Sequence, residues 1–134
     1  QLYPYMIRDS MVHAVAFFAI IGHCFPIWLK FKGGKGVATT LGTMLALAPW
    51  VGVTACAMWA ITAAIFRYSS LAALIAMLSM PLSAYLIYND LVLTPVCAVI
   101  AAIVWAKHHA NIRRLLKGEE PKIGKKKNAD AVQA

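Results

Sequence analysis

Residues 22–40 read GHCFPIWLKFKGGKGVATT, and the rest of the chain is arranged around them. One apolar stretch runs into this segment and another leaves it, with Lys30, Lys32 and Lys35 between them. The glycines beside the lysines permit positive φ and close backbone approach. We predict that a helix begins near Gly36, so that its free N–H groups and positive dipole end point back toward the lysines. This combination suits a phosphate group. A basic, glycine-turned loop between two membrane spans is the alternative interpretation.

The composition is typical of an integral membrane protein. Of the 134 residues, 61% are hydrophobic and 13% are charged, whereas soluble domains carry roughly a quarter charged residues. Between Gly36 and Ala106 the charged residues are Arg67 and Asp90 alone. We therefore predict an all-α, polytopic helix bundle, with one membrane-embedded domain over residues 1–127 and a disordered tail over residues 128–134.

The net charge of +8 is concentrated at the ends of the apolar stretches. Three lysines lie in the central loop, and eight Lys or Arg residues follow from Lys107 onward. Charge gathered at helix ends indicates membrane topology and anionic head groups rather than a nucleic-acid partner, and the aromatic–basic interleaving that a nucleic-acid platform needs is not seen. The three cysteines show no metal-ligand spacing, so neither a metal nor another cofactor is expected.

The apolar stretch from Val37 to Phe66 is too long for one ordinary span. As one straight helix it would measure about 45 Å, against about 30 Å of hydrocarbon core. Pro49 interrupts it, so it is either a kinked span or a hairpin. With the lysine loop in the cytoplasm, only the hairpin also places Arg67 and the basic tail inside, and the positive-inside tendency therefore favours it. The expected membrane segments, about five crossings, are 11–28, the hairpin 37–66, 71–88 and 91–106.

A helix that leaves the membrane is expected to continue from the last span to Lys117 and to end at Gly118. His108 and Asn111 share one face of it, and Arg114 lies one step further round. These three side chains suit a polar ligand at the membrane surface. The alternative is a basic interfacial helix that meets lipid phosphates.

Two further polar positions lie at the edges of the apolar segments. Ser69 and Ser70 precede the span that begins at Leu71, and they are predicted to cap its helix. His23 lies near the end of the first span. It is either a functional ionisable group or a histidine hydrogen-bonded to a neighbouring helix.

Three segments together resemble the bacterial acylphosphate-dependent glycerol-3-phosphate acyltransferases of the PlsY type. The resemblance covers about His13 to Lys122. It rests on Gly22-His23 with Pro26 and the run Phe31–Thr39, on Tyr68-Ser69-Ser70-Leu71, and on His108, Asn111-Ile112, Arg114-Leu115, Gly118 and Glu120.

The resemblance implies a bacterial inner-membrane enzyme with seven crossings and a cytoplasmic active face and C-terminus. Such an enzyme transfers a fatty acyl group from acyl phosphate to the 1-position of glycerol 3-phosphate, in the first step of phospholipid synthesis. Lysophosphatidic acid and phosphate are the products. The partners expected from the resemblance are therefore the two substrates and the lipid bilayer, with a monomer favoured.

The resemblance also implies roles for individual residues. Lys35 is expected to hold substrate phosphate, helped by Lys32, Gly33, Gly34, Gly36, Ser70 and Arg114. His108 and Asn111 are expected to position glycerol 3-phosphate and its attacking hydroxyl. Either His108 or a substrate phosphate takes the hydroxyl proton, and both alternatives stay open. His23 and Glu120 are expected to act mainly as structural residues.

One departure from the family pattern concerns its first motif, a glycine-rich cytoplasmic loop with a phosphate-binding serine and arginine. This sequence has no counterpart of that loop. The chain is therefore expected to correspond to the C-terminal two-thirds of such an enzyme, with little or no activity alone. The alternative function is a non-catalytic membrane module that binds anionic lipid or a partner through its basic loops.

Overall fold

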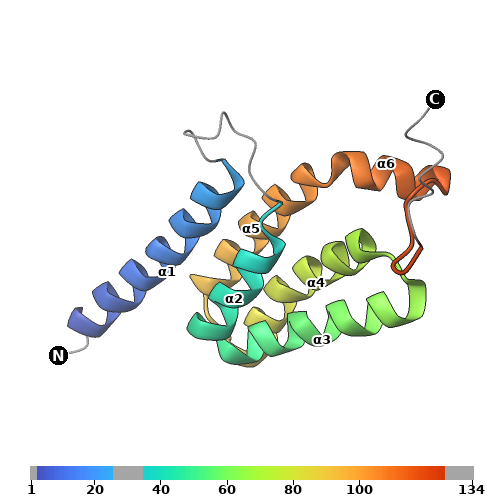
Figure 1. Ribbon diagram of the computed structural model, residues 1–134. Helices are drawn as coiled ribbons and strands as arrows, with labels where there is room; N and C mark the ends of the chain where they lie inside the picture. The colour runs from blue at the N-terminus through green and yellow to red at the C-terminus, as the bar shows by residue number, and fades with distance from the viewer. Residues whose placement is uncertain (1–2, 26–34, 126–134) are drawn as a thin grey trace.

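The computed structural model describes residues 3–25 and 35–125, and this part of the chain is helical without a strand (Figure 1). The predicted all-α class is therefore confirmed. The elements in order are α1 (Tyr3–Cys24), α2 (Val37–Leu47), α3 (Pro49–Phe66), α4 (Ser69–Ser83), the π-helix η2 (Ala84–Tyr88), α5 (Leu93–Lys107) and α6 (His109–Lys117).

The helix boundaries follow from residues that cannot continue a helix. Gly36 precedes α2 in the left-handed conformation, with φ of 79°, as the sequence predicted. Pro49 occupies the first position of α3, where its missing N–H costs nothing. Gly118 ends α6 with φ of 71°. The predicted caps at Ser69 and Ser70 are wrong, because Tyr68 precedes α4 and no side chain caps it.

Two helical segments, Pro49–Phe66 and Ser69–Tyr88, are long and apolar enough to cross a membrane. The bent pair α5 and α6 counts as a third if it is taken as one span. The apolar part of α1, Met11–Cys24, and α2 are shorter. The structure is thus an integral membrane bundle with the predicted hairpin broken at Pro49, while the count of five crossings stays a prediction.

The continuous helix expected through Lys117 is wrong, because the chain bends by 62° between α5 and α6. His108 lies in the bend with φ of −95° and ψ of 10°. Its side-chain Nδ1 donates a hydrogen bond to the Val104 carbonyl at 2.7 Å, and its backbone N–H is shared between Val104 and Trp105. A side chain inserted into the backbone ladder in this way is a known cause of helix bending. We treat α5 as ending the last span at Lys107.

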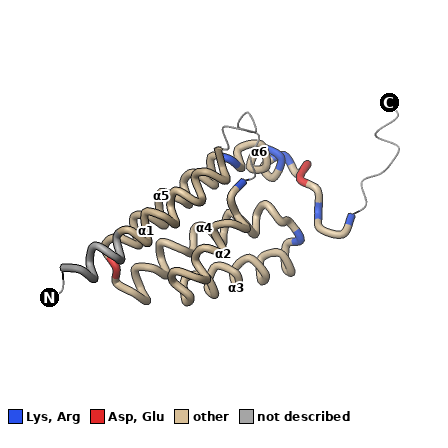
Figure 2. The backbone as a smooth tube through the Cα atoms, turned by 60° about the vertical axis from the view of Figure 1, so that its left-hand side comes forward, with Lys and Arg blue, Asp and Glu red and all other residues tan. Residues whose placement is uncertain are grey.

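The described Lys and Arg residues gather at one end of the bundle (Figure 2). Lys35 and Arg67 lie at the same end as α6, since Lys35 contacts Asn111 and Arg67 contacts Ile123. At the other end Asp90 caps α5 by accepting from the N–H groups of Val92 and Leu93 at 2.7 and 2.9 Å. This is the distribution that the hairpin interpretation requires.

Close approach of two backbones holds the hairpin together. A Cβ atom added at Gly52 of α3 would lie 2.5 Å from the backbone nitrogen of Leu45 in α2 and 2.7 Å from its Cα. Small residues at helix contacts are a general means of packing in membranes. The fully buried side chains of the core cluster include Ile20, Met44, Met77, Met80, Ile100 and Val104.

After Gly118 the chain folds back as a strap, which we define as residues 119–125. Ile123 donates its N–H to the Arg67 carbonyl at 2.7 Å, and Arg67 Nη2 donates to the Ile123 carbonyl at 2.8 Å. The strap therefore joins the end of α6 to the turn between α3 and α4 (Figure 1).

Glu120 is the second attachment point of the strap. Its Oε1 accepts from Ser70 Oγ and from Asn111 Nδ2, and its Oε2 accepts from Arg114 Nε, each at 2.7 Å. Its side chain is only 6% exposed. Burial alone would raise the pKa of Glu120, but the three hydrogen bonds and the Arg114 charge outweigh it and hold the pKa below the ordinary 4.5.

We predict that Gly52→Ala destabilises the bundle, because the new methyl group overlaps immovable backbone of α2. Overpacking of this kind costs about 1–3 kcal/mol. The measurement is thermal unfolding in detergent, followed by circular dichroism. Gly42→Ala is the matched control, since nothing lies within 4 Å of its added Cβ. An equal Tm for Gly52→Ala and the unsubstituted chain would contradict this account of the hairpin.

We predict that Glu120→Gln lowers stability at pH 7 by about 1–3 kcal/mol, the cost of disturbing hydrogen bonds to a buried charge. Because the folded-state pKa is depressed, the carboxylate contributes fully above the unfolded pKa of about 4.5 and loses its contribution as the pH falls through the folded pKa. The Tm difference between the two proteins should therefore shrink below pH 4.5. The control is Glu119→Gln at the exposed neighbour; a difference that is constant with pH, or equal for both variants, would contradict the role of Glu120.

Candidate active site

A pocket of about 280 Å³ lies at the charged end of the bundle, where α2, α3, α4, α6 and the strap meet. Its polar lining is Lys35, Ser69, Ser70, His108, Asn111 and Glu120. Its apolar lining is Val37, Trp59, Ala73 and Pro121. The pocket therefore presents charged and apolar surface to the same occupant.

Lys35 and Asn111 form the central contact, between residues 76 positions apart in the sequence. Lys35 Nζ donates to Asn111 Oδ1, and Asn111 Nδ2 donates to Glu120. A lysine can only donate and a carboxylate only accepts, so these two partners determine the orientation of the Asn111 amide. Asn111 is buried. The contact links the segment that leads into α2 with α6 and, through Glu120, with the strap.

His108 lies beside this contact, just beyond the end of α5. Its hydrogen bond to the Val104 carbonyl requires the proton on Nδ1, which leaves the Nε2 lone pair of the neutral ring as the acceptor. The residue is 3% exposed. Burial lowers the pKa of His108 below the ordinary 6.5, and the Lys35 charge acts in the same direction, against the opposing influence of Val104 and Glu120. The imidazole is consequently neutral at pH 7.

The charges around the pocket leave a positive excess. Lys35 and Arg114 are cations, Glu120 is an anion and His108 is neutral. Arg114 does not line the pocket but donates to Glu120 from a side chain that is 42% exposed. One net positive charge, together with the amide, hydroxyl and imidazole groups, suits a phosphate-bearing ligand.

The structure brings together most of the residues that the sequence singled out. Lys35, Ser70, His108, Asn111 and Glu120 line one pocket, and Arg114 supports it. The structure contradicts the capping role of Ser70, because its hydroxyl donates to Glu120 instead.

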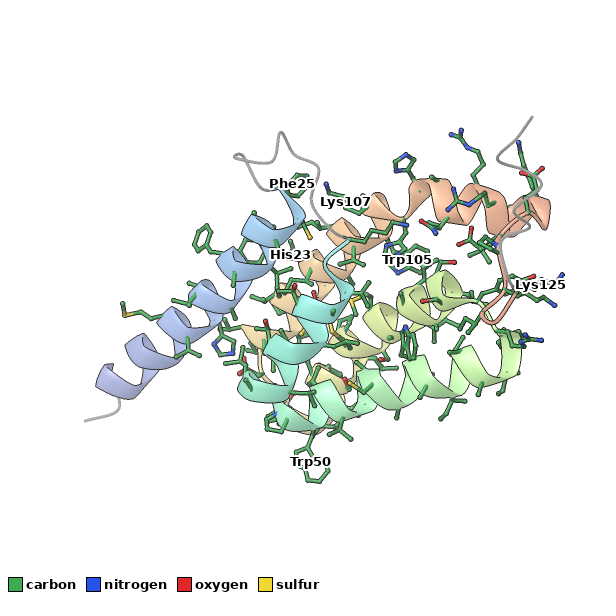
Figure 3. All side chains as sticks on the ribbon, in the orientation of Figure 1. His23, Phe25, Trp50, Trp105, Lys107 and Lys125 are labelled. Carbon is green, nitrogen blue, oxygen red and sulfur yellow. The ribbon has the colours of Figure 1, made fainter. Side chains whose placement is uncertain are left out.

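Gly36 and His23 lie outside the pocket lining. Gly36 turns the backbone into α2. A Cβ atom added at this position would lie 2.5 Å from Cys24 Sγ, so the absence of a side chain leaves room for the sulfur. His23 is on the last turn of α1 and is exposed (Figure 3). Lys32, Gly33 and Gly34 lie outside the described residues.

Sequence reasoning missed the apolar wall of the pocket. Val37, Trp59 and Ala73 come from three different helices, α2, α3 and α4. In a chain with 61% hydrophobic residues, nothing in the local sequence distinguishes these positions from ordinary core or lipid-facing residues. Only the packing of the three helices brings them together.

The chain is similar to curated bacterial proteins named glycerol-3-phosphate acyltransferase. It is 51% identical over 120 residues to that of Jannaschia sp. (strain CCS1), covering 90% of this chain and 59% of the relative. It is 58% identical over 115 residues to that of Rhodospirillum rubrum, covering 83% of this chain and 51% of the relative. The match thus spans little more than half the length of these relatives.

Solved structures give the same relationship. The crystal structure of PlsY, an integral membrane glycerol 3-phosphate acyltransferase, in its glycerol 3-phosphate form superposes with a TM-score of 0.75 at 33% identity, covering 86% of this chain and 56% of that chain. The lysophosphatidic acid form gives a TM-score of 0.72 at 37% identity, covering 78% of this chain and 54% of that chain.

A family model described as glycerol-3-phosphate acyltransferase matches residues 2–118, which is most of the chain. This match includes the residues of α1 to α6 and extends to the glycine that ends α6. The chain belongs to the glycerol-3-phosphate acyltransferase family.

Proposed function

We propose that this chain carries the reaction pocket of an enzyme that transfers a fatty acyl group from acyl phosphate to the 1-hydroxyl of glycerol 3-phosphate. Lysophosphatidic acid and phosphate are the products, in the first step of phospholipid synthesis. The observation that carries the proposal is the convergence of Lys35, His108 and Asn111 in one pocket of mixed polarity. The named substrate forms of the similar PlsY structures support it.

The polar and apolar walls of the pocket match the phosphate and acyl groups of the proposed substrates. Lys35 offers charge and hydrogen bonds to phosphate oxygens, and the Ser70 hydroxyl is proposed to do so after turning its proton from Glu120 to the substrate. Val37, Trp59 and Ala73 offer apolar surface to the first carbons of an acyl chain. Because the pocket lies at the end of the bundle, a lipid tail can remain within the membrane while the phosphate stays near water.

The chemical step needs orientation and removal of one proton. The glycerol hydroxyl oxygen attacks the carbonyl carbon of the acyl phosphate, a carbon–oxygen ester bond forms, and the bond from that carbon to the phosphate oxygen breaks. The phosphate leaves with the bonding electrons. Acyl phosphate is already activated, so positioning and charge neutralisation by Lys35 can supply much of the rate.

His108 is the proposed acceptor of the hydroxyl proton. Its Nε2 carries the lone pair, because Nδ1 donates to Val104, and its lowered pKa keeps the ring neutral at pH 7. Asn111 is proposed to hold the glycerol backbone, since Lys35 and Glu120 determine its orientation. Lys32, Gly33, Gly34 and Gly36 remain proposed contributors to phosphate binding, while His23 and Glu120 remain proposed supporting residues.

The membrane arrangement is part of the proposal. We place the pocket and the C-terminus at the cytoplasmic face of a bacterial inner membrane, because Lys35, Arg67 and the cations of α6 lie at the same end. The same pocket disfavours a purely lipid-binding module, since such a module has no need for a neutral histidine beside an oriented lysine and asparagine.

The proposal is tested with palmitoyl phosphate and glycerol 3-phosphate in nanodiscs, by following both phosphate release and lysophosphatidic acid. The chain is assayed alone and together with the part of the Rhodospirillum rubrum relative that lies outside the match. Turnover in either format, dependent on both substrates, supports the proposal. The absence of turnover in both formats, with the complete relative active, contradicts it.

We predict that Lys35→Ala lowers kcat/KM by about 100- to 1,000-fold, the usual effect of losing one group that stabilises developing charge. Lys35→Arg should recover part of the loss, because it keeps the charge but not the geometry. Lys117→Ala removes an exposed lysine at the end of α6 and serves as the control. An equal loss in both alanine variants would show that only the overall charge matters.

We predict that His108→Gln lowers kcat by about 100- to 10,000-fold if the imidazole is the base. For the unsubstituted chain, kcat/KM should fall as the pH drops through a pKa below 6.5, since protonation removes the lone pair. His109→Gln, at the exposed neighbour, should keep both rate and pH profile. A His108→Gln enzyme with nearly full kcat would instead assign the proton to a substrate phosphate.

A further inference from the structure

The strap gives the pocket a rim whose position is defined at both ends. Glu120 is held by Ser70, Asn111 and Arg114, and Ile123 is paired in both directions with Arg67. Only Pro121 and Lys122 lie between these two attachment points. The backbone that carries Lys122 is therefore anchored to the turn between α3 and α4.

Two observations place Lys122 at the edge of the pocket. It follows Pro121, which lines the pocket, and its Nζ lies 5.7 Å from the ring centroid of Tyr68, which precedes the lining residue Ser69. A cation at this distance from an aromatic ring is attracted to its face. The ammonium group is exposed and is directed over the α3–α4 turn.

Other cations extend the same rim. Arg67 donates to the Ile123 carbonyl of the strap. Lys125 follows on the strap beside the end of α3 (Figure 3). The exposed carboxylate of Glu119 offsets one of the three positive charges. The rim thus carries a positive excess of its own, outside the pocket.

The charges of the proposed substrates indicate a role for the positive excess at the rim. Under the proposed function, to which this inference adds, the enzyme must bring together two phosphate-bearing substrates, each an anion. The described residues in and against the pocket supply one net positive charge, from Lys35 and Arg114 against Glu120. Two phosphate groups near one another are stabilised by further cations, whether these come from this chain or from the part of the relatives outside the match. Lys122 is an exposed cation that directly follows the lining residue Pro121 and lies over Tyr68, the neighbour of the lining residue Ser69.

We propose that Lys122, supported by Tyr68 and by the Arg67–Ile123 pairing, forms a second phosphate-binding subsite at the mouth of the pocket. This subsite receives the phosphate group of one substrate as it enters. Its contribution is electrostatic attraction and positioning, and no bond is made or broken there. The phosphate belongs either to glycerol 3-phosphate or to the acyl phosphate, and the kinetic experiment separates the two.

The test compares Lys122→Gln with Lys122→Arg and with Lys117→Gln as a matched loss of charge on exposed α6. KM is measured for each substrate at a saturating concentration of the other. Lys122→Gln should raise the KM of one substrate by about 3- to 10-fold with kcat unchanged, the size expected for one partly screened charge. Lys122→Arg should restore it. The KM that changes identifies which phosphate the subsite receives.

A binding measurement accompanies the kinetics and does not require turnover. Titration of glycerol 3-phosphate and, separately, of inorganic phosphate into the chain in neutral-lipid nanodiscs should show weaker binding and a smaller salt dependence for Lys122→Gln. Unchanged KM and binding in Lys122→Gln, or equal changes in Lys117→Gln, would overturn the subsite while leaving the proposed function intact. No phosphate binding by the unsubstituted chain, together with no turnover either alone or with the complementing part of the relative, would overturn both.

Discussion

The buried carboxylate of Glu120 is the constraint on which the charged end of the molecule depends. A carboxylate removed from water is costly unless donors surround it. Here Ser70 of α4, Asn111 and Arg114 of α6 supply three such donors. The same contacts bring the strap against the α3–α4 turn and orient the Asn111 amide toward Lys35. Helix position and pocket geometry are therefore consequences of one polar network, whose members strengthen one another in surroundings of low polarity.

Close backbone approach makes this network possible within a small bundle. Gly36 adopts a left-handed conformation and leaves room for the Cys24 sulfur. The chain can therefore turn into α2 directly after Lys35, which keeps Lys35 beside α6. Gly52 lets α3 cross directly over the backbone of α2. The bend at His108 then turns α6 away from the axis of α5. These features place a lysine, a histidine and an asparagine from distant parts of the sequence in one pocket.

The position of the pocket fits the proposed chemistry. It lies where the apolar bundle ends and the cations begin, so that a single occupant can meet Trp59 and Lys35 together. A phosphate group is attracted by the positive end of the molecule, and an acyl chain is accepted by the apolar wall. Burial keeps His108 neutral in the same place. The strap adds charge at the rim without filling the pocket.

The sequence by itself determined the helical class, the hairpin at Pro49 and the end of α6 at Gly118, because composition, proline and glycine act locally. It also indicated Lys35, His108 and Asn111, since their spacing and resemblance to a family are visible in the chain. Only the tertiary structure decided that Ser70 serves Glu120 rather than capping α4, and that Val37, Trp59 and Ala73 form one wall. The bend at His108 likewise arose from a side-chain contact with Val104 that no local pattern indicates. The role of Ser70 and the apolar wall depend on which helices meet, and long-range packing of apolar helices leaves no signature in the spacing of similar residues.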